Sequence, residues 1–439
     1  MNITTGKKMI LGLQHVLAMF GATVLVPLLT GLDPGLALFS AGIGTLLFHS
    51  VTKGIVPVFL GSSFAFITAI AMTLSTHGIA AVKGGIIATG LVYMCIAILI
   101  KFVGVEVIES FFPPIIVGPI IMVIGLRLSP TALDMIGYAP MMHQNAQGAE
   151  MAALLNTHGY EVSSDVFNIA SGMYQIDLKG LLIAGVVVGV MIGVSIFAKG
   201  FFKLVPILIA VVAGYLVAFL LGEVDVQPIL KASWLGFSEM GTETLFTLPS
   251  FSLEAILAIA PIALVVFIEH IGDITTNGAV VGKNFLENPG IHRTLFGDGL
   301  ATAVAGLLGG PANTTYGENT GVLAVTKVYE PQIIRIAAVF AILLSLCGKF
   351  TALIQTIPNP VKGGISIILF GMIASVGVRT LVDAKLDFSH SRNLMIAAII
   401  LVVGIGVDSI AIVGSITISG LAIAALIGIV LNKVLPKDI

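Results

Sequence analysis

Three carboxylates stand inside long apolar runs of this sequence. Glu269 and Asp273 lie four residues apart in "ALVVFIEHIGDITT", and Glu318 lies in "GGPANTTYGENTGVLAVTK". Residues four apart share a helix face, so Glu269 and Asp273 look the same way. A carboxylate at membrane depth costs at least about 2.5 kcal/mol and is therefore a functional candidate. Loss of water favours the neutral form of a carboxyl group, which makes Glu269 and Asp273 candidate proton carriers. His15, whose imidazole lies in the first apolar run, is a third candidate proton carrier.

Composition indicates the elements that must hold these side chains. The 439 residues are 57% hydrophobic and 10% charged, with a mean hydropathy of +1.08, whereas a soluble domain is nearer a quarter charged. Apolar runs about as long as a bilayer is thick recur from end to end, which predicts an all-α polytopic membrane protein. We expect fourteen spans, near residues 10–30, 36–50, 57–75, 79–101, 112–133, 179–199, 204–222, 251–273, 294–309, 311–327, 333–355, 361–380, 393–414 and 417–434.

Positive charge predicts the orientation of these spans. Two long loops on one side are acidic: residues 134–177 contain no Lys or Arg, and residues 223–254 contain only Lys231. Most of the other Lys and Arg residues fall on the opposite side, which the positive-inside rule places in the cytoplasm. We therefore expect both termini to be cytoplasmic, in agreement with an even number of spans. Lys83 and Asp408 lie at predicted span ends, where snorkelling toward water accounts for them.

The two halves of the chain resemble each other. Three pairs of motifs match in the same order at nearly one spacing: "LQH" from Leu13 with "IEH" from Ile268, "PVFLGSSFAF" from Pro57 with "PANTTYGEN" from Pro311, and "PPIIVGPIIMVIG" from Pro113 with "NPVKGGISIILFG" from Asn359. Seven spans per half is an odd number, so the second half must enter the membrane from the opposite side. Residues 1–222 and 223–439 are thus predicted to be inverted repeats, a signature of secondary transporters.

Each half contains one interrupted segment at a corresponding position. "PVFLGSSFAFITAI" and "GGPANTTYGENTGVLAV" both open with Pro and Gly, carry hydroxyl residues and then become apolar. We interpret each as an extended entry followed by a half-helix that begins near the middle of the bilayer. Free backbone N–H groups and the positive dipole end at such a start form a polar binding point. Gly61, Ser63 and Asn319 belong to these segments and are candidates for shaping the site.

These groups limit the ligand. Carboxylates accept hydrogen bonds from N–H or O–H donors, whereas free backbone N–H groups bind carbonyl oxygens. A small planar ring that alternates N–H and C=O satisfies both, and Phe64 or Tyr316 could cover its face. Two nearby carboxylates disfavour an anion but suit a cation such as Na⁺. The residues therefore leave a nucleobase carrier and a cation transporter both open.

Other classes of protein lack their signatures here. No GxxxxGK[ST] phosphate loop is present, so the chain does not encode an ATP-driven pump. His and Cys do not cluster at metal-ligand spacing, and we expect no metal or other cofactor. Cys95 and Cys347 fall within apolar spans and predict free thiols. A net charge of −2 argues against a nucleic-acid partner. An intramembrane enzyme is the remotest alternative, because nothing supplies a nucleophile or a metal.

The motifs resemble a known family. "ENTGVLAVTK", Glu318 to Lys327, fits the Glu/Gln-Asn-x-Gly-x-x-x-x-Thr-Arg/Lys/Gly signature of the nucleobase–ascorbate transporter family, the nucleobase–cation symporters. "LQHVLAMFGATVLVP", "LGSSFAFI", "VVFIEHIGD" and "NTTYGENTGV" are similar to its bacterial members that carry uracil. The resemblance covers nearly the whole chain and implies residence in the bacterial cytoplasmic membrane.

The resemblance also implies an arrangement of the spans. Segments 1–4 and 8–11 would form a core domain, and segments 5–7 and 12–14 a gate domain. Segments 3 and 10 would each combine a short strand with a half-helix, the two strands lying antiparallel. A homodimer through the gate domain is the family tendency. Proton symport by alternating access would be the mechanism, with membrane lipid around the protein and no covalent chemistry.

Residue roles follow from the same resemblance. Uracil would lie between the two strands, with Glu269 accepting one ring N–H and Glu318 accepting another. Backbone amides at Phe64 and Gly317 would meet the carbonyl oxygens. One position departs from the resemblance, because a uracil carrier of the family has a His four residues after the first Glu, where this chain has Asp273.

Because Asp273 departs from the family pattern, alternative functions stay open. An acid in place of a base changes the charge and the protons available, so the coupling ion and base preference are unsettled. A carrier of xanthine or another purine, or a Na⁺-coupled nucleobase carrier, is the first alternative. An ion channel of the same general fold is the second, and the paired carboxylates argue against anions. For His15, a hydrogen bond between helices is the more ordinary role.

Overall fold

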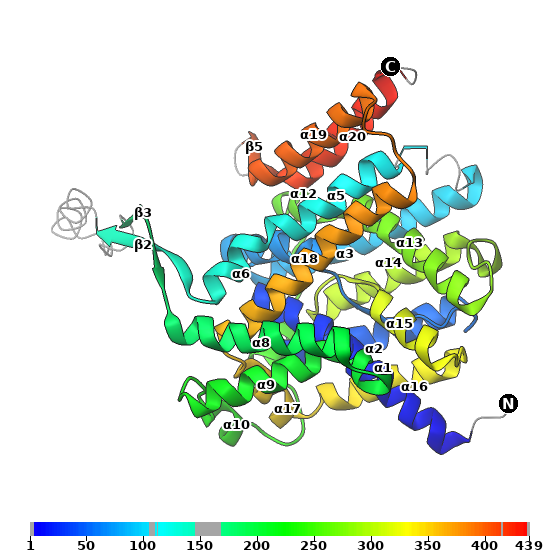
Figure 1. The fold of residues 1–439 in the computed structure, drawn as a ribbon. Helices are drawn as coiled ribbons and strands as arrows, with labels where there is room; N and C mark the ends of the chain where they lie inside the picture. The colour runs from blue at the N-terminus through cyan, green and yellow to red at the C-terminus, as the bar shows by residue number, and fades with distance from the viewer. Residues whose placement is uncertain (1–3, 105–109, 112, 145–167, 414–415, 437–439) are drawn as a thin grey trace.

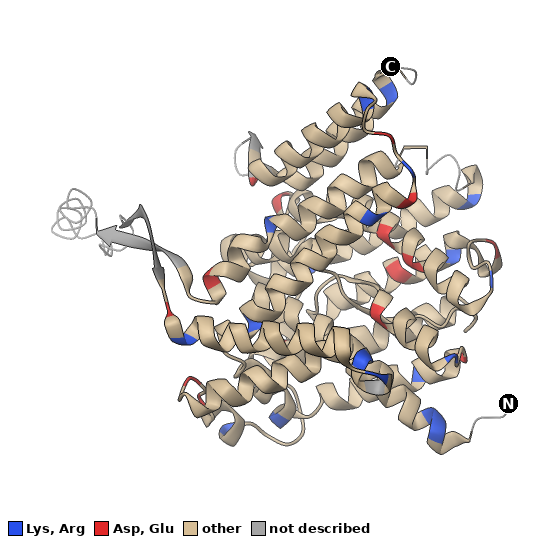
Figure 2. Ribbon diagram, viewed as in Figure 1, with Lys and Arg blue, Asp and Glu red and all other residues tan. Residues whose placement is uncertain are grey.

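The computed structural model describes residues 4–104, 110–111, 113–144, 168–413 and 416–436. Within these residues the chain is a packed bundle of helices with three short pairs of antiparallel strands (Figure 1). Residues 145–167 of the predicted acidic loop lie outside the described part. Most of the helical ribbon carries no charged residue (Figure 2), as a protein surrounded by lipid requires.

The first half of the chain shows how the sequence ends one helix and begins the next. The first helix stops at Gly31, whose left-handed backbone (φ +82°) permits the turn. Asp33 then accepts a hydrogen bond from the Leu36 N–H at 2.8 Å, and Pro34 begins the second helix. The elements are α1 (Thr5–Thr30), α2 (Pro34–Val51), β1 (Leu60–Ser62), η1 (Phe64–Phe66), α3 (Ile67–Val103), α5 (Pro114–Arg127), α6 (Ser129–Met135), β2 (Tyr138–Gln144), β3 (Asn168–Ile176), α8 (Leu178–Phe197), η3 (Gly200–Leu204) and α9 (Pro206–Leu220).

The second half uses serine caps at several helix starts. Ser238, Ser252 and Ser419 each accept a hydrogen bond from a backbone N–H of the helix that follows. The elements are α10 (Gln227–Lys231), α11 (Glu239–Phe246), α12 (Leu253–Ile259), η4 (Ala260–Ile262), α13 (Ala263–Val281), η5 (Leu286–Gly290), α14 (Ile291–Leu308), β4 (Asn313–Thr315), α15 (Gly317–Thr326), α16 (Pro331–Ser345), α17 (Gly348–Gln355), α18 (Asn359–Asp383), α19 (Ser391–Gly406), β5 (Ser409–Val413), β6 (Ile416–Ser419) and α20 (Gly420–Val434).

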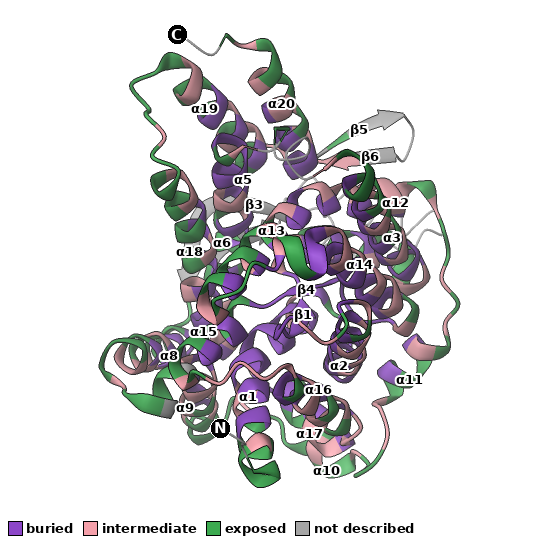
Figure 3. Cartoon of the chain, turned by 90° about the vertical axis from the view of Figure 1, so that its right-hand side faces the viewer, coloured by how far each residue is buried: buried purple, intermediate pink, exposed green. Residues whose placement is uncertain are grey.

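The helices pack as two groups. In one, α14 packs against α3 and α2, α16 against α1 and α2, and α12 against α3. In the other, α18 packs against α5, α8 and α9, while α19 packs against α20 and α5. Buried residues gather where the helices meet (Figure 3), for example Tyr93, Phe267 and Leu295 in the first group. Ile116 and Ile396 serve the same purpose in the second group.

Two short strands from distant parts of the chain pair near the centre. We call this strand pair, β1 with β4, the crossing. β1 pairs with β4 in antiparallel register, with Leu60 opposite Thr315 and Ser62 opposite Asn313. Thr45 of α2 holds β1, because its hydroxyl accepts from the Leu60 N–H at 2.9 Å. Thr302 of α14 holds β4 by donating to the Asn313 carbonyl at 2.9 Å. Each strand is thus fixed by a threonine from the neighbouring helix in its own half.

The number of spans remains a prediction. Seven described helices are long and apolar enough to cross a membrane, and an eighth follows if α16 and α17, bent by 81°, form one span. Three shorter apolar helices are α9, α19 and α20. The expected spans 57–75 and 79–101 both fall on η1 and α3, and the α3 backbone breaks at Gly78 (φ +74°). That break separates the two expected spans within one assigned helix.

The structure differs from expectation in two further respects. Besides β1 and β4, it contains the pairs β2–β3 and β5–β6, which the sequence did not predict. Lys83 does not snorkel to water: it is only 1% exposed. Its ammonium donates to the carbonyls of Thr244 at 2.8 Å and Thr247 at 2.6 Å. A buried cation is tolerated here because the last carbonyls of α11 satisfy it.

Candidate functional site

The β1–β4 crossing places two helix starts beside each other. η1 begins at Phe64, one residue after β1 ends, and α15 begins at Gly317, one residue after β4 ends. The first N–H groups of a helix have no partner within it and point outward from its positive end. The crossing therefore presents backbone donors from both halves of the chain. The interrupted segments predicted a polar binding point at such helix starts, and that role stays a prediction.

Gly61 makes the close approach of the two strands feasible. A Cβ atom at this position would lie 2.5 Å from Cζ of Tyr316 and 2.7 Å from Oγ1 of Thr23. The Tyr316 ring therefore lies across β1, and its hydroxyl donates to the Ser62 carbonyl at 2.9 Å. Thr23 of α1 donates to the same hydroxyl at 3.2 Å. Tyr316 thus ties together β1, α15 and α1.

α13 brings two carboxylates to the start of α15. Asp273 accepts a hydrogen bond from the Thr315 hydroxyl of β4 at 2.8 Å. Its other oxygen would lie 3.9 Å from a Cβ atom placed at Gly317. Glu269 lies one turn earlier on the same face of α13, and its side chain is exposed. The α13 carboxylates thus face the end of β4 and the first turn of α15.

Glu318 completes the acidic group from the opposite element. It lies in the first turn of α15, where a negative charge is favoured by the helix dipole. Its side chain is exposed, and Gly317, the residue before it, lies next to Asp273. Glu269 and Glu318 are therefore accessible, and Asp273 between Thr315 and Gly317 is half-buried. Together with the helix N–H groups, they offer hydrogen-bond acceptors and donors within one site.

His15 and Asn319 form a contact behind this group. The Asn319 amide donates to the His15 carbonyl at 3.0 Å, and it also lies 3.1 Å from Nδ1 of the imidazole. Both residues are buried. This contact joins α1 to α15, which agrees with the more ordinary role considered for His15. Ser63 is buried as well, and its backbone N–H donates to the Ala312 carbonyl at 2.9 Å across the strand pair.

A buried pair beside the site was not singled out from the sequence. Nδ1 of His270 lies 3.1 Å from the Asp298 carboxylate, and both side chains are fully buried. The other imidazole nitrogen lies 3.0 Å from the Thr294 hydroxyl. The available signal was Asp298 itself, an acid within the apolar segment "LFGDGLATAV". Next to Glu269 in sequence, His270 points away from the acidic group and fixes α13 against α14.

The site therefore combines carboxylate acceptors with backbone donors. Among the described residues, no three His, Cys, Asp or Glu side chains are grouped so as to hold a metal ion. Cys95 and Cys347 are free, as predicted. Such an arrangement can bind a polar heterocycle and exchange protons with water.

Comparison with known proteins agrees with this chemistry. The pattern of a family described as a permease family matches residues 6–174 and 161–412. The chain is 42% identical over 431 residues to a probable uracil permease of Haemophilus influenzae, covering 98% of this chain and 95% of that protein. It is also 42% identical over 426 residues to the uracil permease of Bacillus subtilis, covering 97% and 92%.

A solved structure shares the fold at low sequence identity. The transmembrane domain of the cyanobacterial bicarbonate transporter BicA superposes with a TM-score of 0.63 at 14% identity, covering 97% of this chain and 96% of that one. This likeness concerns the fold alone. Together with the apolar helices and the permease relatives, it identifies the chain as an integral membrane protein.

Proposed function

Because the chain belongs to the nucleobase–ascorbate transporter family, we propose that it imports uracil by proton symport. The protein is a permease and not an enzyme. The observation that carries the proposal is the hydrogen bond from Thr315 to Asp273, since it brings the α13 carboxylates to the start of α15. The names of the relatives supply uracil, and the site offers groups that match it.

Uracil binds at the β1–β4 crossing in this proposal. Glu269 and Glu318 accept the two ring N–H groups, and backbone N–H groups at Phe64 and Gly317 donate to the two carbonyl oxygens. Tyr316 supports the crossing and borders the ring. The exposure of both glutamates supports the assignment, because a ligand must reach them. Gly61, Ser63 and Asn319 hold the two strands and helix starts in place.

Proton coupling uses the carboxylates that share this space. Three negative charges in one site repel, so protonation of Glu269 or Asp273 lowers the cost of closing the site around a neutral base. Release of the proton on the cytoplasmic side restores the charge. His15 contributes to coupling indirectly. Its imidazole contacts Asn319, which follows Glu318 in α15 and so helps to position that carboxylate.

Alternating access follows from the two packed groups of helices. In the proposal, residues 1–222 and 223–439 are inverted repeats of seven spans each, in the bacterial cytoplasmic membrane with both termini inside. Segments 1–4 and 8–11 form the core domain and the remaining segments the gate domain, with a homodimer through the gate. The packing of α18 on α5 and of α14 on α3 supports this division.

Uptake into liposomes tests the proposal. The purified protein should accumulate radiolabelled uracil when the external pH is lower than the internal pH, and a protonophore should abolish accumulation. The variant Glu318→Gln should reduce uptake at least about tenfold while the protein remains extractable and folded. Uptake that ignores the protonophore would remove proton coupling, and unchanged uptake by E318Q would remove Glu318 from the site.

A Na⁺-coupled nucleobase carrier is the second candidate. Asp273 stands where the uracil carriers of the family have a His, and its carboxylate with the Thr315 hydroxyl provides the oxygen atoms that a hard cation prefers. Uptake measured with Na⁺ replaced by choline separates the two ions. Competition by unlabelled xanthine and other purines tests the base in the same assay.

A further inference from the structure

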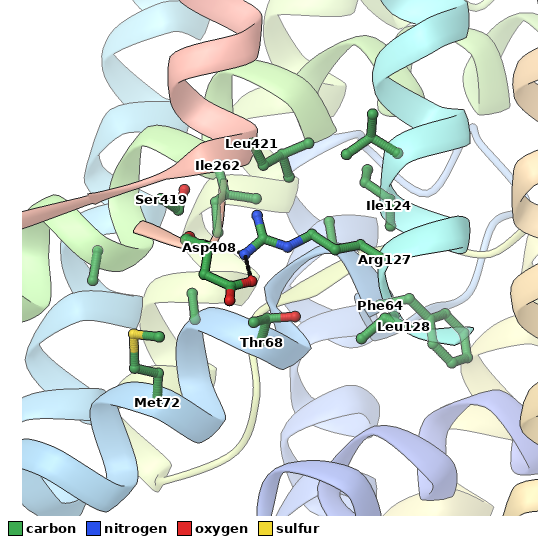
Figure 4. A pocket seen from close by; sticks show the side chains of 14 residues that line it. Phe64, Thr68, Met72, Ile124, Arg127, Leu128, Ile262, Asp408, Ser419 and Leu421 are labelled. Atoms are coloured by element: carbon green, nitrogen blue, oxygen red, sulfur yellow. Dashed lines mark hydrogen bonds and ion pairs between the residues drawn. The ribbon is translucent and has the colours of Figure 1, made fainter. Parts of the chain in front are cut away.

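A pocket away from the carboxylates has apolar walls and one ion pair. Its walls include Phe64 from η1, Ile124 from α5 and Leu421 from α20. In Figure 4 the side chains of Arg127 and Asp408 extend into it, joined by an ion pair at 2.9 Å. The pocket therefore lies where helices of the two packed groups meet. Nothing in the proposed uracil site uses Arg127.

The Arg127 side chain is largely buried, and some of its N–H groups make no short hydrogen bond. Its side chain is 10% exposed, whereas that of Asp408 is 87% exposed. One terminal nitrogen, Nη2, donates to the carboxylate and to the backbone carbonyl of Asp408, each at 2.9 Å. The other, Nη1, makes only a long contact of 3.4 Å with the Gly404 carbonyl. In the described part of the chain, Nε donates to no group.

The pair recognises a particular ligand chemistry. The carboxylate cancels the charge of the guanidinium, so the pocket has no excess charge to attract an anion. Spare N–H donors of Arg127 stand beside an exposed carboxylate oxygen of Asp408. A neutral ring that carries a C=O next to an N–H can meet both at once. Phe64, Ile124 and Leu421 supply apolar contact for such a ring.

The pocket lies close to the uracil site along two elements. Ile262 lines the pocket at the end of η4, directly before α13, and it precedes Glu269 of α13 by seven residues, a rise of about 10 Å along a helix. Phe64 lines the pocket with its side chain, while its backbone begins the helix start proposed to bind uracil. Phe64 therefore adjoins both positions. In the proposed orientation, the pocket is on the outer side.

We propose that this pocket is an outer subsite at which a neutral heterocycle with adjacent C=O and N–H groups binds before it reaches the carboxylates. Arg127 donates to the carbonyl oxygen and Asp408 accepts from the N–H. The inference rests on the proposed function, because the ligand class and the outer position come from it. It assigns to Arg127 and Asp408 a role in capture from dilute solution, separate from proton coupling.

Binding of radiolabelled uracil to the purified full-length protein tests the subsite. The wild-type protein should bind two uracil molecules, one tightly and one weakly. Glu318→Gln should lose only the tight class, and E318Q combined with Arg127→Met should lose both. R127M alone should raise the KM of uptake about tenfold and leave kcat unchanged. The matched control is Arg379→Met, which breaks the exposed Arg379–Asp383 pair of α18 and should change neither class.

A second variant separates recognition from folding. Met72→Trp fills the pocket from α3 and keeps both residues of the ion pair, and it should also remove the weak class. A merely structural role of Arg127 would instead weaken both classes together. Loss of all binding in E318Q, or survival of the weak class in E318Q/R127M, overturns the subsite and leaves the proposed function standing. Absence of uracil binding by the wild-type protein overturns both.

Discussion

Asp273 is the residue at which this chain departs from the pattern that the family resemblance implies. A His at this position can carry a positive charge, whereas Asp273 adds a third negative charge beside Glu269 and Glu318. The Thr315 hydroxyl stabilises that charge through one hydrogen bond of 2.8 Å. Three interacting carboxylates do not all remain ionised when a ligand excludes water. In the proposed mechanism, Asp273 therefore takes up the proton that accompanies the base.

Removal of this acid should uncouple transport from the proton gradient. Asp273→Asn keeps a partner for Thr315 but takes no proton, so accumulation driven by a pH gradient should fall about tenfold or more. Exchange of internal for external uracil at equal pH needs no net proton movement and should continue. The two rates are measured in the same liposomes.

The control keeps the acid and removes its partner. Thr315→Val retains the carboxylate and should lower gradient-driven uptake much less than Asp273→Asn does. Accumulation by D273N at the wild-type level would assign coupling to Glu269 alone. Loss of both accumulation and exchange would make Asp273 a binding residue instead.

Local sequence motifs predicted the residues of the acidic group, but they did not predict which distant residues contact one another. Glu318 was identifiable because Gly, Pro and Asn surround it, and Glu269 because an apolar helix contains it. The bond of Lys83 to Thr244 spans 161 residues, and that of Arg127 to Asp408 spans 281. No periodicity connects residues so far apart, so these partners emerge only from the fold.

At the scale of elements, the crossing of β1 and β4 determines whether the two helix starts meet. The strands have only three residues each, so few hydrogen bonds hold them. Thr45 and Thr302 add bonds from the neighbouring helices, and Tyr316 spans the crossing. Side chains at the crossing must therefore be small where the elements touch. Gly61 is the position at which this requirement is strictest.

A single methyl group at Gly61 should impair transport. Gly61→Ala places a Cβ 2.5 Å from the Tyr316 ring, closer than packed atoms approach, and the strand must shift. We expect the affinity for uracil to fall about tenfold or more. The matched control is Gly185→Ala on α8, where a Cβ would meet no atom within 4 Å. Wild-type binding by G61A would show that the crossing tolerates such a shift.

The same glycines and prolines explain which elements the sequence could anticipate. Residues that break helices act locally, so Pro57, Gly61 and Pro311 mark the two interruptions through their residue types alone. The pair β2–β3 lies outside the expected spans, whereas β5–β6 falls where the expected spans 393–414 and 417–434 meet, and its apolar residues fit a membrane span as well as a strand. The break in α3 at Gly78 was likewise marked by its glycine, and it falls between the expected spans 57–75 and 79–101.

At the scale of the whole molecule, the fold alone does not determine whether an ion or a nucleobase is transported. The chain shares its fold with the transmembrane domain of a bicarbonate transporter at 14% identity. An anion carrier needs positive groups at the helix starts, whereas this chain places Glu318 and Asp273 there. Selectivity therefore resides in a few side chains on a common scaffold.

The exposure of the acidic group predicts the side from which it opens. α15 runs from the crossing toward Lys327 and Arg335, which positive charge assigns to the cytoplasm. Gly321 on α15 has no atom within 4 Å of an added Cβ, so a cysteine fits there. In a chain with Cys95 and Cys347 replaced by Ser, Gly321→Cys should react with an impermeant maleimide in inside-out vesicles.

Right-side-out vesicles supply the contrasting result. G321C should react slowly there, and uracil should slow the reaction in inside-out vesicles, because a bound base covers the first turns of α15. Gly189→Cys on α8 is the control, since its open face meets lipid in the proposed arrangement and should react from neither side. Labelling of G321C from the outside alone would reverse the proposed orientation. Labelling that uracil does not slow would separate α15 from the binding site.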